Sequence, residues 1–428
     1  MSEPDGPGGP GGPEGPGRPG ASESTTPSLR RDLGLAEVVV YGVGLILGAG
    51  IYAILGEATA VAGESIPLAF LAAAVVASFT GLSYAELASR FPRGEGDYVY
   101  VRETFGKRPA EVVAFLRVFV GSVSAAAVAL AFAGYLSSFV DLSPVLAAVA
   151  LVAVASAVNF WGIDVSAKLN LVFTAAEVGG LALVIWLGLG SWGSVAVLDA
   201  PFGPGGVLEA TFLVFFAYLG FGSIVNVAEE TEDPTRTVPR AIVLSVGITT
   251  VLYVLVAVSA VGVADWRALG ESASPLALVA EAGGGPAAAS IVGAIALTST
   301  ANTVLILLVS SSRLVYGVSK SEYRSFPTLF SRIHVRRGTP YLAVALVGGL
   351  TVPFVLLGDL GQVAALANGS LLVVFVAVNA ALLKLRFDRP ENREGFTAPL
   401  TVGRLSVTAL CGLVTALGLL VVYLGRFL

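Results

Sequence analysis

The chain has 428 residues, of which 55% are hydrophobic and 13% are charged, and its mean hydropathy is +0.83. Soluble domains carry about 25% charged residues, so this composition excludes an ordinary soluble protein. The formal net charge is −5. The lone Cys411 excludes an internal disulfide framework, and the lone His334 excludes histidine-based metal clusters.

The N-terminal segment MSEPDGPGGPGGPEGPGRPGASESTTPS has too few apolar residues to form a core. It also lacks the basic start and apolar run of a cleaved signal peptide. We therefore predict a disordered cytoplasmic tail over residues 1–32, outside the folded part of the chain.

Apolar runs of about 20 residues follow, which is the length that a helix needs to cross a bilayer. They predict about eleven transmembrane helices in an all-α integral membrane protein. The predicted spans are 35–56, 66–88, 109–139, 144–161, 168–190, 207–228, 238–263, 286–317, 340–358, 361–385 and 402–426.

Lysine and arginine residues gather in alternate loops, which predicts the orientation of the chain. They precede the first span and follow the second, sixth, eighth and tenth, whereas the other loops contain only Arg267. The N-terminus is therefore predicted to be cytoplasmic and the C-terminus external, in a multi-pass protein of the plasma membrane. Because these basic residues follow the membrane rule, no nucleic-acid partner is expected.

Two spans are interrupted by small residues at corresponding places. Gly48 and Gly50 interrupt the first span, and Gly220 and Gly222 interrupt the sixth. Unwound backbone inside a bilayer is tolerated only where protein or a water-filled cavity satisfies it. A pair of interrupted spans in two halves of a chain indicates a transporter binding site.

The two halves also mirror each other in outline. The third and eighth spans are both unusually long. A short amphipathic stretch, DYVYVRETFG, follows the second span on the predicted cytoplasmic side, and SPLALVAEA follows the seventh on the external side. Matching elements on opposite sides are what an inverted repeat of five plus five helices would give.

Four motifs carry a resemblance to amino-acid permeases of the amino acid–polyamine–organocation superfamily. They are GLILGAGIYAILG (44–56), SYAELASRFPRGEGDYVYVRETFG (83–106), FFAYLGFGSIVNVAEETEDPTRTVPRAI (215–242) and SSSRLVYGVSKSEYRSFPTLFSRIHVRRGTP (310–340). The resemblance covers about residues 33–426. It implies a five-plus-five inverted-repeat transporter fold with broken helices 1 and 6.

The resemblance also sets the expected domain boundaries. Residues 33–200 would form the first inverted repeat (helices 1–5) and residues 201–386 the second (helices 6–10). Residues 387–428 would form a cytoplasmic loop and an additional helix 11. Within this scheme the segment 228–240 is predicted to anchor a cytoplasmic gate; the alternative is a solvated turn set by its prolines.

The first interruption is predicted to bind the carboxylate of an amino-acid substrate. Backbone N–H groups at the start of a helix attract an anion, and glycine permits the turn and a close approach of the ligand. The alternative is that these glycines only let helices pack closely. The predicted substrate residues of this span are Ile46, Gly48, Ala49, Gly50 and Ile51.

The sixth span is predicted to bind the substrate ammonium group. Carbonyls near Phe216, Ala217 and Leu219 can accept from it, and Phe216 and Phe221 can close over the substrate; lipid or core contact is the alternative for each phenylalanine. Permeases that resemble cationic transporters often have an acidic residue where this chain has Gly222. This departure favours neutral, apolar amino acids.

Glu177 lies near the middle of the fifth span, where a charge costs about 3 kcal/mol on insertion scales. Such a residue usually faces a partner or a cavity. We predict that Glu177 binds the coupling proton; it could instead ligate Na⁺ or pair with Arg117. Some related permeases have a lysine here, so their mechanism does not carry over unchanged.

A sodium site is the alternative means of coupling. Hydroxyls on the eighth span, above all Thr298 and Ser299, and carbonyls near Val43 and Ile46 are oxygen ligands of the kind that hard cations take. The other interpretation is that these hydroxyls bond helix carbonyls without any function.

The sequence therefore predicts a secondary active transporter of amino acids that works by proton-coupled alternating access. A Na⁺-coupled symporter, an exchanger and a non-transporting amino-acid sensor are the alternatives. The sequence contains no Walker loop, HExxH or CxxC motif, and we expect neither enzymatic activity nor a cofactor or resident metal.

Overall fold

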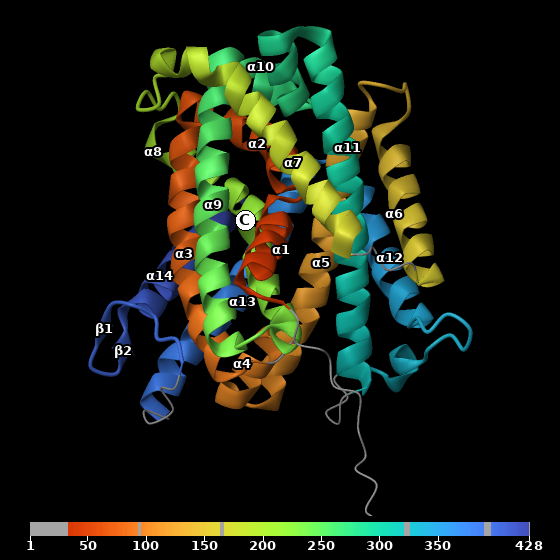
Figure 1. Cartoon of the computed structure of the whole chain (residues 1–428), viewed down its shortest axis with the longest axis vertical. Coiled ribbons are helices and arrows are strands. Elements are labelled where there is room, and N and C mark those ends of the chain that lie inside the picture. The colour runs from red at the N-terminus through yellow and green to blue at the C-terminus, as the bar shows by residue number, and fades with distance from the viewer. Residues whose placement is uncertain (1–32, 93–95, 163–166, 321–325, 389–394, 428) are drawn as a thin grey trace, which may run out of the picture. The chain divides into compact units, whose positions relative to one another are not determined.

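A computed structural model describes residues 33–92, 96–162, 167–320, 326–388 and 395–427. The tail predicted over residues 1–32 lies outside the described residues. In the described part, the chain folds almost entirely into helices (Figure 1).

The bounds of the elements are as follows. The helices are α1 (Leu35–Leu47), α2 (Gly50–Ala62), η1 (Gly63–Ser65), α3 (Ile66–Arg90), α4 (Asp97–Phe105), α5 (Lys107–Leu136), α6 (Pro144–Trp161), α7 (Ala167–Gly188), η2 (Leu189–Ser194), α8 (Gly203–Val214), η3 (Phe215–Glu230), α9 (Pro234–Val263), α10 (Trp266–Glu271), α11 (Pro275–Lys320), η4 (Thr328–Ser331), α12 (Tyr341–Val355), α13 (Leu360–Asp388) and α14 (Val407–Phe427). The strands β1 (Thr401–Val402) and β2 (Leu405–Ser406) form an antiparallel hairpin.

Apolar helices of membrane-spanning length make up most of the chain. Nine helices in the described ranges are long and apolar enough to cross a membrane, and α1 and α12 are shorter apolar helices. The prediction of an all-α integral membrane protein is confirmed. The count of eleven spans and the inverted repeat stay predictions.

Proline marks where several of these helices begin or bend. It occupies one of the first two positions of α3, α6, α8 and α9, where its missing N–H has no helical partner to lose. Within α11, Gly285 has φ 77° and precedes Pro286, so the helix bends there. The long predicted eighth span is therefore the part of α11 that follows this bend.

Several pairs of packed helices come from opposite halves of the chain. α3 packs against α9, α5 against α11, α1 against η3 and α2 against α8. The short helices α4 and α10 lie at opposite ends of the bundle (Figure 1). A two-fold relation between the halves would produce this pairing, which supports the predicted inverted repeat.

The chain segments next to the two interrupted spans are joined by backbone hydrogen bonds. Leu33, just before α1, pairs with Thr231, just after η3, in an isolated parallel bridge. The Leu33 N–H donates to the Glu230 carbonyl at 3.1 Å, and the Glu232 N–H donates to the Leu33 carbonyl at 2.9 Å. This contact involves the segment 228–240 in holding one end of both spans together.

A buried charge cluster joins α3 to α13. Glu86 is 0% exposed and forms ion pairs with Arg90 on its own helix and with Arg386, which is 1% exposed. The Ala398 N–H donates to the same carboxylate at 2.9 Å, and Arg386 Nη1 donates to Thr401 at 2.9 Å. Removing one member of such a cluster would leave the other charges buried without a partner, which is costly. The cluster therefore fixes the segment that follows α13 against α3.

The predicted orientation can be tested with single cysteines because Cys411 is the only native one. In a Cys411→Ser background, a membrane-impermeant maleimide should label Ser194→Cys in intact cells. It should label Arg404→Cys only after permeabilisation. Both positions are exposed, and they belong to loops that the basic residues predict to lie on opposite sides. Labelling of Arg404→Cys in intact cells would reverse the assigned orientation.

Candidate functional site

The predicted interruption of the first span is confirmed. α1 ends at Leu47, Gly48 follows with φ 26° and ψ −145°, and α2 begins at Gly50. A positive φ of this kind is costly for residues with a side chain, which explains the glycine at position 48. The turn exposes carbonyls at the end of α1 and N–H groups at the start of α2.

Two hydroxyls on α11 bind the backbone of this turn. The Ala49 N–H donates to Thr303 Oγ1 at 3.1 Å, and Ser299 Oγ donates to the Gly48 carbonyl at 3.1 Å. The N–H groups of Gly50 and Ile51 lack an intrahelical acceptor because they lie at the start of α2, and the N-cap residue Ala49 has no side chain that could cap them. Ile51 itself is fully buried.

The sixth span changes its helix type rather than stopping. α8 ends at Val214, and residues 215–230 continue as the 3₁₀ helix η3. Such helices rarely exceed three or four residues, and a long one inside a span often marks a functional hinge. The change begins at Phe215, before the glycines that predicted it.

One tyrosine hydroxyl bridges both interrupted spans. Tyr253 on α9 lies 2.7 Å from the Ile46 carbonyl, 3.2 Å from the Leu47 carbonyl and 3.1 Å from the Ala217 carbonyl. A phenol has a single hydrogen to donate. Three carbonyl oxygens therefore meet around one donor, and the site is rich in acceptors.

Glycine also serves close packing here. A Cβ added at Gly50 would lie 2.6 Å from the Ala217 Cα, and one at Gly220 would overlap the Leu45 carbonyl. The backbones of α1, α2 and η3 are thus in direct contact. Close packing therefore explains the glycines at positions 50 and 220, and the positive φ explains Gly48.

The remaining predicted residues of the sixth span lie on different sides of η3. Phe216 is buried at 4% exposure, and Leu219 is half-buried. Phe221 packs edge-on against Tyr84, with ring centroids 5.7 Å apart. A Cβ at Gly222 would lie 3.4 Å from the same Tyr84 ring. Phe221 and Gly222 therefore face α3.

Glu177 lies on α7 beside the same group of side chains. It is 3% exposed, its carboxyl group interacts with the Ser299 hydroxyl, and its Oε2 has no hydrogen-bond partner. The Tyr52 hydroxyl donates to the Glu177 backbone carbonyl at 3.3 Å. A buried carboxyl group with one oxygen unsatisfied is unusual, and it marks Glu177 as a candidate functional residue.

The alternative pairing of Glu177 with Arg117 is wrong. Arg117 instead forms an ion pair with Asp97 on α4, with its Nε 2.7 Å from Asp97 Oδ2. The Asp97 side chain is 5% exposed, so this pair satisfies the arginine away from Glu177. The sequence did not indicate it because Asp97 lies in an amphipathic stretch outside the spans.

The predicted sodium ligands do not all meet. Ser299 contacts the Gly48 carbonyl and Glu177, whereas Thr298 is exposed and bonds the Ala294 and Ile295 carbonyls of its own helix, at 3.2 and 2.9 Å. Val43 is buried on α1, and the carbonyl that Ser299 reaches belongs to Gly48. Of the two predicted sodium ligands Thr298 and Ser299, only Ser299 joins the site.

Sequence reasoning missed Tyr253 and Tyr52, both of which bond to backbone carbonyls in the site. The available signal was a tyrosine inside an apolar span, since a buried phenol usually needs a partner. Thr303 was one of several hydroxyls on its span, and nothing in the pattern distinguished it.

These features define a multi-pass helical membrane protein with a polar site at two interrupted spans. The sequence profile described as amino acid permease matches residues 33–426, so the chain belongs to the amino acid permease family. It is a membrane transport protein of that family and not an enzyme.

Three relatives illustrate the range of the family. The branched-chain amino acid permease BcaP of Bacillus subtilis is 28% identical over 403 residues, covering 89% of this chain and 86% of that protein. An uncharacterized transporter of Mycobacterium tuberculosis is 32% identical over 372 residues, covering 86% and 83%. Cationic amino acid transporter 4 of Homo sapiens is 31% identical over 396 residues, covering 86% of this chain and 62% of that protein.

The bridging role of Tyr253 predicts the effect of removing its hydroxyl. Tyr253→Phe should lower the free energy of unfolding by about 1–3 kcal/mol, because buried carbonyls lose their donor. Thermal unfolding in detergent measures this change. Tyr316→Phe is the matched control, since that hydroxyl makes no hydrogen bond in the described part of the chain. Equal melting temperatures for the two variants would contradict a bridging role.

Proposed function

We propose that this chain is a secondary active transporter of neutral, apolar amino acids, coupled to protons and working by alternating access. The observation that carries the proposal is the meeting of α1, α2 and η3 at one place, with N–H groups and carbonyls on adjacent sides. Membership of the amino acid permease family supports it.

The two sides of this site suit the two charges of an amino acid. The start of α2 carries the partial positive charge of a helix N-terminus, and Gly50 and Ile51 supply N–H groups for a carboxylate. The carbonyls of Ile46, Leu47 and Ala217 supply acceptors for an ammonium group. In this scheme the ammonium takes over carbonyls that Tyr253 holds in the structure.

The side chain of the substrate would meet mainly apolar surroundings. Phe216 lies next to Ala217, and Gly222 faces the Tyr84 ring, so the sixth span offers no carboxylate at these positions. The relative BcaP is named for branched-chain amino acids and supports this preference. The human relative is named for cationic amino acids. Selectivity between neutral and cationic amino acids is therefore the property to test.

Competition for binding tests the neutral preference. Leucine, alanine or phenylalanine should displace a labelled neutral amino acid better than arginine does. Gly222→Asp should improve competition by arginine roughly tenfold, because a charge-assisted hydrogen bond becomes available. Gly222→Ala is the control, since its methyl group meets Tyr84 at an ordinary contact distance of 3.4 Å. Arginine as the best competitor against the native protein would exclude neutral selectivity.

Coupling is assigned to Glu177. Its carboxyl group interacts with Ser299, which in turn donates to the Gly48 carbonyl in the turn of the first span. Gain or loss of a proton at Glu177 would therefore act on the same turn that is proposed to hold the substrate. The unpartnered Oε2 atom is where such a proton can reside.

Replacing Glu177 separates proton coupling from sodium coupling. In proteoliposomes, Glu177→Gln should keep substrate binding and exchange but lose accumulation driven by a pH gradient, because glutamine keeps the shape and cannot titrate. Glu271→Gln, at the exposed end of α10, is the control.

Three results would change the assignment. Wild-type accumulation under a pH gradient in Glu177→Gln would remove the proton from Glu177. Accumulation that instead follows a Na⁺ gradient, and weakens in the same variant, would indicate a sodium symporter. Binding without transport of any kind would favour a sensor.

A further inference from the structure

The connection between α11 and α12 is unusually basic. Residues 326–340 read FPTLFSRIHVRRGTP and contain Arg332, His334, Arg336 and Arg337 without a single acidic residue. We call this segment the basic connection. It lies on the side of the membrane that the distribution of lysine and arginine predicts to be cytoplasmic.

The backbone of the basic connection is held in a defined shape. The His334 N–H donates to the Thr339 carbonyl at 2.9 Å, and the Gly338 N–H donates to the His334 carbonyl at 2.9 Å. Thr339 Oγ1 donates to the Phe160 carbonyl at the end of α6, also at 2.9 Å. The segment is therefore fixed to α6 before any ligand binds.

Aromatic rings hold its cationic side chains. The Arg337 guanidinium lies 4.4 Å from the centre of the Phe160 ring and 5.5 Å from that of Trp161. The His334 ring packs edge-on against Phe160 with centroids 5.6 Å apart. Arg336 and Arg337 form no ion pair with a carboxylate in the described part of the chain. Within the described residues, Arg337 is thus held by aromatic rings, and Arg336 is exposed without a carboxylate partner.

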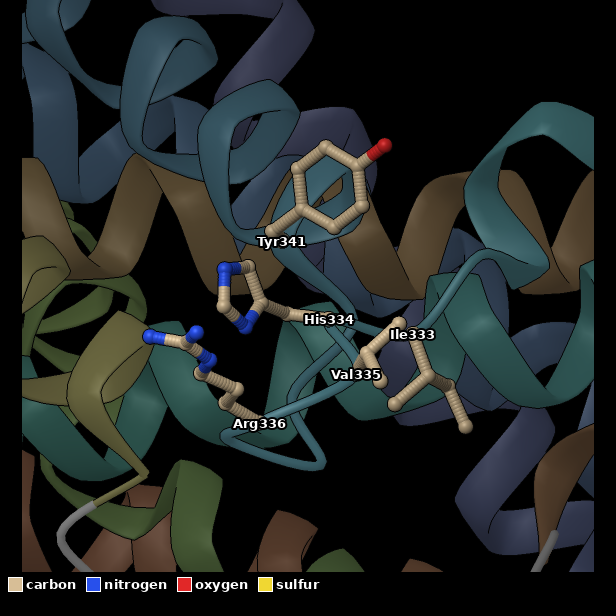
Figure 2. Close-up of a pocket in the computed structure, with 5 residues that line it drawn as sticks. All are labelled: Ile333, His334, Val335, Arg336 and Tyr341. Carbon is tan, nitrogen blue, oxygen red and sulfur yellow. The ribbon is translucent and has the colours of Figure 1, made fainter.

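Apolar side chains stand exposed beside these charges. Val335 is 100% exposed and Ile333 45% exposed, and Trp161 at the end of α6 is 57% exposed. Figure 2 shows Ile333 and Arg336 pointing to different sides of the connection. Apolar and basic groups in alternation suit the boundary between acyl chains and headgroups, where tryptophan and tyrosine also gather.

Two hollows adjoin the connection. A pocket of about 130 Å³ is lined by Arg313 and Arg337 together with the polar side chains of Asn159, Ser312 and Thr339. A shallower one of about 420 Å³ is lined by His334, Arg336 and their neighbours (Figure 2). Guanidinium groups next to amide and hydroxyl groups are the chemistry that binds a phosphate.

We propose that the basic connection binds the headgroup of an acidic phospholipid of the cytoplasmic leaflet. Arg336 and Arg337, each lining one of the two adjoining hollows, attract the anionic headgroup, and the acyl chains lie along Ile333 and Val335. Charge complementarity selects an anionic lipid over a zwitterionic one, because each arginine near the surface attracts it. The proposal rests on the predicted orientation and is independent of the transported substrate.

Lipid titration of the purified full chain in detergent tests this site. Phosphatidylglycerol should bind more tightly than phosphatidylcholine, as measured by lipids retained in native mass spectrometry. The double variant Arg336→Gln, Arg337→Gln should weaken phosphatidylglycerol binding by roughly tenfold or more. The double variant Arg240→Gln, Arg404→Gln should not, although it removes the same charge from the same predicted side at exposed positions.

A second pair of measurements identifies the ligand. Arg336→Lys with Arg337→Lys keeps the charge and should retain most of the binding, which also shows that the connection tolerates substitution. Glycerol 3-phosphate and inorganic phosphate should not displace the lipid at comparable concentrations. Displacement by either would make the site one for free phosphate and overturn the lipid proposal. Equal binding of the two lipids, or an equal loss in the control variant, would also overturn it.

Discussion

Backbone groups inside a bilayer must find partners, and the structure around the two interrupted spans depends on this requirement. At Gly48 the chain gives up helical hydrogen bonds in the apolar interior. Tyr253, Ser299 and Thr303 replace them from two other helices, α9 and α11. Since each replacement comes from a side chain, it can be released without unfolding the helix that carries it. A reversible binding site needs backbone groups that require hydrogen-bond partners. It also needs partner side chains that can release those groups.

The buried charges follow a related division. Glu86 is paired with Arg90 and Arg386, and Asp97 is paired with Arg117. Such pairs are costly to break and therefore hold neighbouring elements together. Glu177, which is 3% exposed, differs because it forms no ion pair with a residue that the structure describes. Among these carboxylates, Glu177 is therefore the one that we propose as the carrier of the coupling proton.

Much of the fold could be predicted from the sequence because each membrane-spanning helix requires an apolar run of matching length. The helices and the break at Gly48 follow from apolar length and from glycine, and the family follows from the motifs. Contacts between distant spans could not be predicted. The Tyr253 hydroxyl donates to the carbonyl of Ile46, which lies 207 positions away in the sequence. Arg117 pairs with Asp97 and not with Glu177, and only the three-dimensional structure shows this. Thr298 and Ser299 are adjacent in sequence, yet the helical rotation between them sends one outward and the other into the site.

The bridge between Leu33 and Thr231 has a consequence for how the interrupted spans move. Its hydrogen bonds join backbone to backbone, so they hold α1 and η3 together at one end whatever the side chains at these positions are. In the proposed alternating access, opening on that side would therefore move the two half-spans together rather than independently. Because these bonds use only backbone atoms, proline at position 33 or 232 would remove one donor, whereas other substitutions there would keep both bonds. Sequence variation at these positions would therefore not reveal that the two spans are joined.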